Sequence, residues 1–254
     1  MCLIVLAFQS HPRYPLIVVA NRDEYYERPA AAADFWADTP GILAGRDLEA
    51  GGTWFGVNKH GRWSAVTNFR GGGQKGELSR GELPTNFLAE RERGPVDYLG
   101  RVLAQGARYN GFSLLVGDAE QLAYGNNLGC EVEQLNAGIY TLSNDRLDTP
   151  WPKSELARRM LVQAIDASEL RSEDLLRVLA SRDCFPDGHL PDTGVGIEME
   201  RTLSPPFIVA ETYGTRCTTV LMIDNTGELT FAEQSFLHGK PLGDLRQYRF
   251  AIET

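Results

Sequence analysis

The sequence predicts an α+β fold in which two mainly antiparallel β-sheets pack together, with helices on their outer faces. First, the 254-residue chain contains many short apolar segments bounded by turn residues, a pattern typical of strands. Second, residues 2–8 and 15–20 are apolar at every position, as expected for strands buried on both faces. Third, two pairs of helical segments separate groups of strands. Strands buried on both sides need a layer on each side, which two sheets with outer helices provide.

The first two strands are expected to form an antiparallel hairpin. Residues 2–8 and 15–20 flank a turn at His11-Pro12-Arg13. The first apolar run lacks a basic segment before it and is soon interrupted by Pro12, so we interpret it as a strand rather than a signal peptide. Together these strands should be adjacent and central in the sandwich. Residues 25–50 show no periodicity and are expected to be irregular.

The middle of the chain alternates hairpins with helices. A strand ending at Asn58, a turn at 59–61 and a returning strand at 62–68 lead into Gly71-Gly72-Gly73. This glycine run predicts a tight or mobile loop, and it lacks the Gly-Lys-Ser/Thr ending of a phosphate loop. The further elements expected here are a helix at 84–92, a helix starting near Pro95, a hairpin of 112–117 with 121–124, and a strand at 138–142.

The last third begins with the clearest helix, which starts at Pro152. Ser172 is expected to be the N-cap of the next helix. Residues 183–206 carry four prolines and three glycines without periodicity, and a loop of this length predicts a flap over a binding cavity. Strands are expected at 207–210, 216–223, 228–234 and 246–252. Since no repeat or linker is evident, we expect a single domain spanning residues 1–254.

Composition excludes several classes of function. The net charge is −9 without a block of like charge, which argues against nucleic-acid binding. No apolar run is long enough for a membrane helix, so no integral membrane segment is expected. The four cysteines and four histidines are scattered and show neither a Cys-x-x-Cys pair nor metal-ligand spacing. We therefore expect a cytoplasmic protein without a metal or other cofactor.

Cys2 is the candidate nucleophile. Removal of Met1, which is efficient before a small residue, would give Cys2 both a thiol and a free α-amine. These groups have ordinary pKa values of about 8.5 and 8, so the amine can accept the thiol proton without a separate histidine. The alternative is that Cys2 is a small apolar residue buried in a strand.

Polar residues at predicted strand ends are the candidate partners of Cys2. Asn21-Arg22-Asp23-Glu24 follows the second buried strand directly. In a regular strand Arg22 and Asp23 point to opposite faces, so both can reach Cys2 only if the strand bends or ends there. The alternative is a solvated strand end with a local ion pair, especially for Glu24.

Three further polar residues lie at strand ends. The side-chain amides of Asn68 and Asn144 can donate to a developing oxyanion, although asparagine is also common where strands turn. Arg216 could hold a substrate carboxylate or orient the thiolate, or instead pair with an exposed acid. Cys217 is expected to belong to the core. We expect Cys2, Asp23, Asn68, Asn144 and Arg216 to converge on one cavity.

Five motifs occur together along the chain: Asn21-Arg22-Asp23-Glu24 near Cys2, Gly51-Gly52-Thr53-Trp54, Thr67-Asn68, Ser143-Asn144 and Thr215-Arg216-Cys217-Thr218-Thr219. With these motifs nearly the whole chain resembles the NRDE family, also called the transport and Golgi organisation protein 2 family. That family is related to N-terminal nucleophile (Ntn) hydrolases, which implies a four-layer αββα sandwich. Within that superfamily the pattern is similar to the choloylglycine hydrolase and penicillin V acylase group.

The resemblance implies a set of residue roles. Cys2 would be the nucleophile, Asp23 would position its α-amine, and Arg22 and Arg216 would line the thiol. Asn68 and Asn144 would lie near the oxyanion. The sequence departs from that group in one respect, because Arg22 and Asp23 are adjacent here whereas those enzymes separate the arginine from the aspartate.

The expected function is therefore hydrolysis of a non-peptide amide bond in a small amide or acyl substrate. The alternative is a non-catalytic binding or carrier protein for haem or lipid-like ligands, in which Cys2 is inert. Eukaryotic members of the resembled family are associated with mitochondrial, lipid and haem handling, which favours this alternative.

Overall fold

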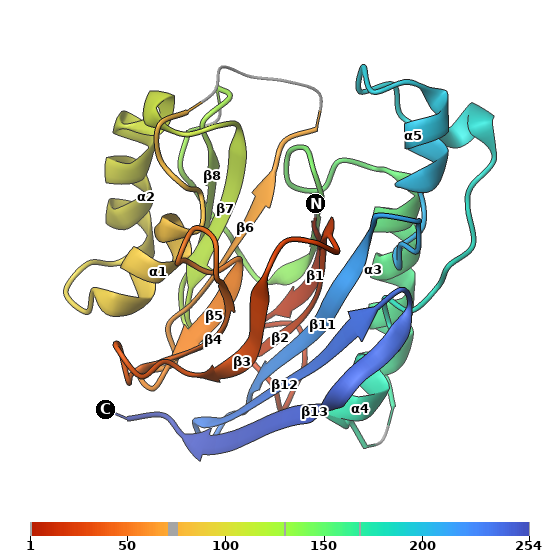
Figure 1. Ribbon diagram of the computed structural model, residues 1–254. Helices are drawn as coiled ribbons and strands as arrows, with labels where there is room; N and C mark the ends of the chain where they lie inside the picture. Colours follow the sequence, from red (N-terminus) through yellow and green to blue (C-terminus); the bar gives the residue numbers. More distant parts are fainter. Residues whose placement is uncertain (1, 71–75, 130, 168, 254) are drawn as a thin grey trace.

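The computed structural model describes residues 2–70, 76–129, 131–167 and 169–253. Met1 and the glycine run at 71–73 lie outside these ranges. Four layers follow one another in the order helices, sheet, sheet, helices (Figure 1). The predicted α+β architecture with two mainly antiparallel sheets and outer helices is thereby confirmed.

The first sheet has six strands, and both predicted N-terminal strands lie inside it. β1 and β2 are neighbours and neither is an edge strand, as the apolar runs predict. All neighbouring strands are antiparallel. In spatial order the strands are β10 (Gly138–Leu142), β1 (Cys2–Phe8), β2 (Leu16–Tyr25), β11 (Tyr213–Ile223), β12 (Glu228–Leu237) and β13 (Lys240–Ala251).

The second sheet is an antiparallel meander, because its seven strands are adjacent in the order in which they occur along the chain. They are β3 (Ala30–Phe35), β4 (Ile42–Asp47), β5 (Phe55–Asn58), β6 (Trp63–Asn68), β7 (Phe112–Gly117), β8 (Leu122–Asn126) and β9 (Glu133–Gln134).

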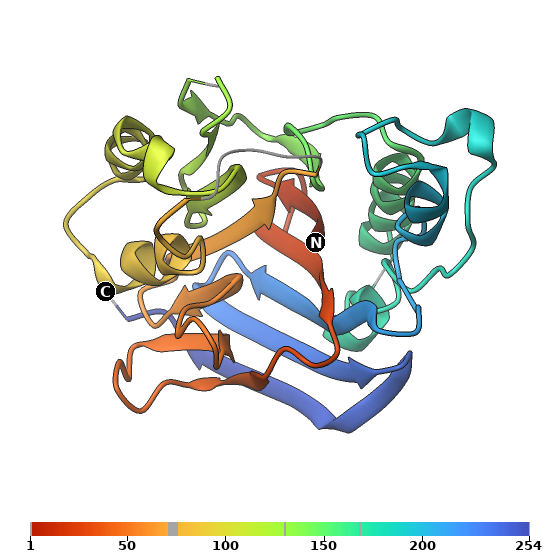
Figure 2. The same ribbon diagram turned by 45° about the horizontal axis from the view of Figure 1, so that its top comes forward.

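Helices cover the outer face of each sheet. α1 (Glu82–Ala89) and α2 (Pro95–Ala104) pack on the second sheet, while α3 (Pro152–Ile165) and α4 (Ser172–Leu175) pack on the first. Figure 2 shows the α1 and α2 pair in yellow and α3 in green on opposite sides of the sheets. The remaining helical elements are α5 (Ile197–Thr202) and two short 3₁₀ turns, Gly106–Arg108 and Asp187–His189.

Side-chain alternation divides the apolar residues of β1 and β2 between two cores. Ile4, Leu6 and Val18 belong to the core between the sheets, whereas Val5 and Val19 belong to the core beneath α3 and α4. Because successive side chains point to opposite faces, one continuous apolar run supplies both cores. This explains why these strands are apolar at every position.

Several predicted elements are wrong. Residues 25–50 are not irregular, because they contain β3 and β4. The strand expected at 207–210 is reduced to a single bridge between Val209 and Gly214. Ser172 is the first residue of α4, where Arg171 is the N-cap, and the Ser172 hydroxyl donates to Glu173 Oε2 at 3.3 Å instead.

The most consequential difference concerns β2, which continues to Tyr25 instead of ending near residue 20. The pairing of β2 with β1 ends at Arg22, opposite Cys2. The pairing of β2 with β11 continues further, since Tyr213 and Gly214 pair with Tyr25 and Glu24. The Asn21-Arg22-Asp23-Glu24 segment is therefore part of the strand rather than an end that follows it.

Two negative findings apply to the described ranges. None of the helices there combines the length and apolar character needed to cross a bilayer. In the same ranges, His, Cys, Asp and Glu side chains form no group of three or more that could hold a metal ion.

Candidate active site

The hairpin of β1 and β2 places Cys2 directly opposite Arg22. Arg22 in turn pairs with Cys217 of β11, so the three residues form one row across the first sheet. Directly paired residues in an antiparallel ladder point to the same face. This row continues the face that carries Ile4 and Ala20, so Cys2 and Arg22 lie at the end of the core between the sheets.

Asn21 and Asp23 point to the opposite face, towards the helices. The Asn21 amide donates to the backbone carbonyls of Leu179 and Pro206 at 3.0 and 2.9 Å. Asp23 is buried, and its Oδ1 accepts a 2.7 Å hydrogen bond from the Thr215 hydroxyl. Asn21 thus fixes the segments around residues 179 and 206 to the sheet, and Asp23 lies beside the start of β1 from the helix side.

Burial raises the pKa of the Cys2 thiol above its ordinary value, and the negative charge of Asp23 raises it further. The charge of Arg22 and a hydrogen bond from the Asp23 backbone N–H act in the opposite direction but do not offset the increase. The thiol is therefore protonated at neutral pH. Its reaction with an acyl carbon would require a base.

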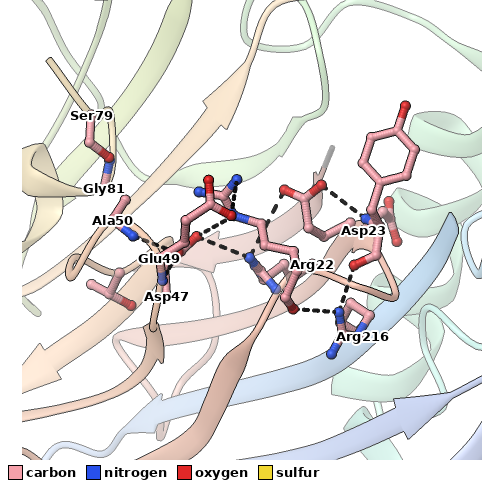
Figure 3. Close-up of polar contacts among 12 residues, drawn as sticks. Arg22, Asp23, Asp47, Glu49, Ala50, Ser79, Gly81 and Arg216 are labelled. Carbon is pink, nitrogen blue, oxygen red and sulfur yellow. Dashed lines mark hydrogen bonds and ion pairs between the residues drawn. The ribbon is translucent and has the colours of Figure 1, made fainter. Parts of the chain in front are cut away.

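Arg22 contacts Asp47 and Trp54. Its Nη2 lies 3.4 Å from Asp47 Oδ2, and its guanidinium carbon lies 4.2 Å from the centre of the Trp54 ring. Asp47 Oδ2 also lies 2.7 Å from Arg28 Nε. Figure 3 shows Asp47 beside Glu49 and Ala50. Although burial raises the pKa of Asp47, hydrogen bonds from Arg28 and two backbone N–H groups hold it below its ordinary value. Asp47 remains charged at neutral pH.

A cavity of about 470 Å³ opens at this end of the sandwich. Its lining is mostly polar and comes from both sheets and from the turn before α1. Four of the predicted site residues contribute to it: Cys2, Arg22, Asp23 and Asn68. We refer to it as the Cys2 cavity. The lining also includes the aromatic side chain of Trp54 and several charged side chains from neighbouring turns and strands, among them Glu24, Arg28, Asp47, Glu77 and Arg80.

Asn144 lies behind the cavity wall. Its side chain is buried and donates to the backbone carbonyl of Asn68 at 2.9 Å. The neighbouring Ser143 hydroxyl donates to the backbone carbonyl of Cys2 at 3.2 Å. These two residues thus tie the ends of β10, β1 and β6 together. Asn144 positions Asn68 rather than lining the cavity.

Arg216 does not line the Cys2 cavity, contrary to the expectation from the sequence. It lies at a bulge, since Thr215 pairs with Asp23 while Cys217 pairs with the preceding residue of β2. Such an extra residue redirects the side chain. The Arg216 guanidinium donates to the backbone carbonyls of Tyr25 and Arg28 at 2.7 and 3.0 Å (Figure 3). It lines a separate hollow of about 250 Å³, which also borders Arg22 and Trp54.

A group of buried charges that was not predicted from the sequence lies on the helix side of the site. Lys153 of α3 is 3% exposed, and its Nζ donates to the Leu203 carbonyl at 3.2 Å. Burial lowers the pKa of Lys153 to about 8, and the charge of Arg70 lowers it too, whereas Asp23 raises it. Arg70 forms a buried ion pair with Glu200 of α5. A lysine in the first turn of an amphipathic helix gives no sequence signal of burial.

Comparison with known proteins identifies the family. The family model for Transport and Golgi organisation 2 matches residues 1–238. The mouse Transport and Golgi organization 2 homolog is 35% identical over 260 residues, covering 93% of this chain and 94% of that protein. The human homolog is 34% identical over 279 residues and covers all of both chains.

Solved structures with little sequence similarity share the fold. An N-acylethanolamine-hydrolyzing acid amidase ortholog from Caenorhabditis elegans has a TM-score of 0.52 at 10% identity, covering 87% of this chain and 92% of that chain. A mutant conjugated bile acid hydrolase from Clostridium perfringens has a TM-score of 0.52 at 9% identity, covering 98% and 97%. The chain therefore belongs to the Transport and Golgi organisation 2 family and has the fold of the Ntn hydrolases.

Proposed function

We propose that this protein is a cysteine amidohydrolase that uses Cys2 as its N-terminal nucleophile and cleaves a non-peptide amide bond. The observation that carries this proposal is the position of Cys2 in the lining of the polar cavity, opposite Arg22 and beside Asp23. One of the two structural neighbours named above is an acid amidase that hydrolyses N-acylethanolamines and the other is a conjugated bile acid hydrolase, which supports a hydrolytic reaction.

Removal of Met1 would supply the base that the buried thiol needs. The freed α-amine of Cys2 accepts the thiol proton, and the thiolate attacks the carbonyl carbon of the amide. The carbon–sulfur bond forms, the carbon–nitrogen bond breaks, and the leaving amine takes the proton. Water then attacks the thioester, which releases a carboxylic acid and restores the thiol.

The neighbouring residues have distinct proposed roles. Asp23 holds the α-amine in position from the helix side of the strand. The Asn68 side-chain amide, which lines the cavity, donates to the developing oxyanion. Asn144 acts through Asn68, to whose backbone it is bonded. Arg22 stabilises the thiolate electrostatically and is itself fixed by Asp47 and Trp54.

The second candidate function is non-catalytic carriage of a lipid-like ligand. It is favoured by a hollow of about 630 Å³ beside the Cys2 cavity, whose lining includes Phe69, Val195, Met199 and Leu203. A carrier would need this apolar hollow but would not need Cys2.

Trapping of the acyl-enzyme separates the two functions. The protein is mixed with N-acyl p-nitroanilides of different chain length, quenched in acid, and digested for peptide mass analysis. The hydrolase proposal predicts nitroaniline release and an acyl adduct on Cys2. Cys2→Ala should lose both, and Cys184→Ala, at an exposed free cysteine, should keep both. Ligand binding without an adduct on Cys2 would favour the carrier.

A further inference from the structure

The apolar hollow and the Cys2 cavity meet along one wall. Both are lined by Glu24, Asn68 and Arg80. Beyond this wall, the hollow of about 630 Å³ is largely apolar, and two of its side chains, Met199 and Val195, are 47% and 36% exposed. Scattered exposed apolar side chains are ordinary, but a group of them around one hollow indicates a binding surface. We call this hollow the apolar groove; its lining includes Tyr25, Phe69, Val195, Met199, Leu203, Ala210 and Tyr213.

Arg80 is the cation of the shared wall. It lies in the turn before α1, and its Nη1 donates to the backbone carbonyl of Gly111 at 3.1 Å. Within the described ranges, no carboxylate oxygen lies within 4.0 Å of its guanidinium, whereas Arg22, Arg28 and Arg70 each have such a partner. Among the residues that the structure describes, one backbone carbonyl is the hydrogen-bond partner of this half-buried guanidinium, which leaves other N–H donors for an anion.

Two of the acids around Arg80 are engaged elsewhere, and a third is exposed at the rim. Asp47 accepts from Arg28 and from the backbone N–H groups of Glu49 and Ala50. Glu24 accepts from the Tyr25 backbone N–H and faces Arg22 at 4.0 Å. Glu77 is exposed at the rim of the cavity. The positive charge of Arg80 is thus available to a ligand that enters between the cavity and the groove.

We propose that the two hollows together bind an anionic amphiphile, with its acyl chain in the apolar groove and its carboxylate on Arg80. An amide of a fatty acid with an amino acid has this chemistry. The amide bond, which links the chain to the carboxylate, then lies at the shared wall, and this wall also borders the cavity that Cys2 lines. Naming the amide as the reacting bond rests on the proposed hydrolase function, whereas the binding selectivity does not.

Binding to the full chain carrying Cys2→Ser tests the selectivity without turnover. The probes are N-dodecanoyl-glycine and N-dodecanoyl-glycinamide, which differ in the carboxylate alone, used below their micellar concentrations in titration calorimetry. We expect the glycine compound to bind about tenfold more tightly, as for one charge-assisted hydrogen-bonded pair. In the same background Arg80→Gln should reduce this ratio below about twofold, and Arg80→Lys should retain part of it. Arg91→Gln, an exposed arginine on neither lining, is the matched control.

The apolar groove is tested by chain length. Shortening the acyl chain from dodecanoyl to octanoyl should weaken binding by at least about tenfold, because four methylene groups lose contact. Met199→Glu should abolish this dependence, whereas Val162→Glu on the exposed side of α3 should preserve it. Thermal unfolding without ligand checks that each variant is folded.

Equal binding of the two glycine probes, or a preference that persists in Arg80→Gln, would overturn the inference. If the Cys2→Ser variant binds selectively but the protein with Cys2 unchanged hydrolyses neither probe, the hydrolase proposal is wrong and the proposed binding site stands. If the protein with Cys2 unchanged hydrolyses the probes but binding shows no selectivity, the proposed binding site is wrong and the hydrolase proposal stands.

Discussion

Lys153 and Asp23 bring opposite charges together in a buried part of the molecule. Both are buried, on α3 and β2 respectively, and each charge favours the ionised form of the other. Burial nevertheless dominates both, since it lowers the pKa of Lys153 and raises that of Asp23. A carboxylate kept beside a cation and beneath the start of β1 can hold an amine at Cys2. We therefore regard Lys153 as a positioning residue of the proposed site.

The stability of the protein should depend on the titration of Lys153. Its pKa falls from 10.5 to about 8 on folding, so between these values the unfolded chain binds one more proton than the folded chain. The contribution of Lys153 to the free energy of unfolding is therefore fully present above pH 10.5 and is lost as the pH falls through the folded-state pKa of about 8. The slope is up to about 1.4 kcal/mol per pH unit.

Comparison with Lys153→Met isolates this effect, because every other titrating group is common to both proteins. Urea unfolding is measured from pH 7 to pH 10, above and below the folded-state pKa of about 8. The wild-type protein should gain stability relative to the variant as the pH rises from 8 to 10. A difference that stays constant over this range would show that Lys153 is not desolvated.

At the scale of elements, the end of β2 determines the site. Its polar residues remain in the ladder because β11 continues to pair with them after β1 has begun at Cys2. Arg22 is thereby directed between the sheets and Asp23 towards α3. Because β2 runs beside the start of β1, it places one charged side chain near Cys2 on each face of the sheet: Arg22 on one and Asp23 on the other.

The sequence predicted elements better than it predicted side-chain directions. Apolar runs specify β1 and the first half of β2 locally, whereas the polar second half depends on pairing with β11, which is remote in sequence. The same limit applies to Arg216, because a bulge cannot be read from alternation. Polar residues near the ends of strands were the signal that correctly placed four side chains at one cavity: Cys2, Arg22, Asp23 and Asn68. Arg80 and Lys153 come from a turn and a helix, where nothing in the sequence marks them as buried.

One anchor of the segment 183–206 is the buried carboxylate of Glu200. Glu200 is 2% exposed, pairs with Arg70 and accepts from the backbone N–H and the hydroxyl of Thr193. Val195, Met199 and Leu203 of the same segment line the apolar groove. The segment is thus fixed at α5 and presents apolar side chains to the groove, and its role as a flap stays a prediction.

Glu200→Ala should release this segment. It leaves the Arg70 guanidinium buried without its carboxylate, which costs about 3–5 kcal/mol. Glu198→Ala, on the same helix but 83% exposed in its pair with Arg201, should cost less than about 1 kcal/mol. Urea unfolding gives the stability of each variant, and limited proteolysis maps any opening to 183–206. Similar losses in both variants would refute the anchoring role.

The whole molecule is stabilised by the core between its two sheets. Phe231 of β12 is fully buried there, and its ring centre lies 6.1 Å from that of Phe55 on β5. Glu233 also joins the sheets, since its carboxylate accepts from the Ala33 backbone N–H at 2.7 Å and the Thr219 hydroxyl at 3.0 Å. The Cys2 cavity lies at one end of this interface, so the relative position of the sheets sets the position of the site.

Phe231→Ala should therefore destabilise the protein by about 3–5 kcal/mol, through lost burial and the resulting cavity. Val162→Ala, at a 38% exposed position on α3, should change the unfolding free energy by less than about 0.5 kcal/mol. Urea unfolding measures both. A loss below about 1 kcal/mol for Phe231→Ala would mean that the two sheets do not share a close-packed core.

The central claim is that Cys2 acts as a nucleophile with its own α-amine as base. The direct measurement compares a sample whose Met1 has been removed with one in which Glu is inserted between Met1 and Cys2 to block removal. Each is labelled with a thiol-reactive electrophile from pH 6 to pH 9, which brackets the ordinary α-amine pKa of about 8. Adducts at Cys2 are followed by intact mass.

We predict that the processed form reacts faster at neutral pH and loses this advantage as its amine becomes protonated at low pH. An acylated nitrogen has no basic lone pair, so the blocked form should react slowly, as expected for a buried thiol of raised pKa. Equal labelling of the two forms across this pH range would contradict the account and leave Cys2 an ordinary thiol.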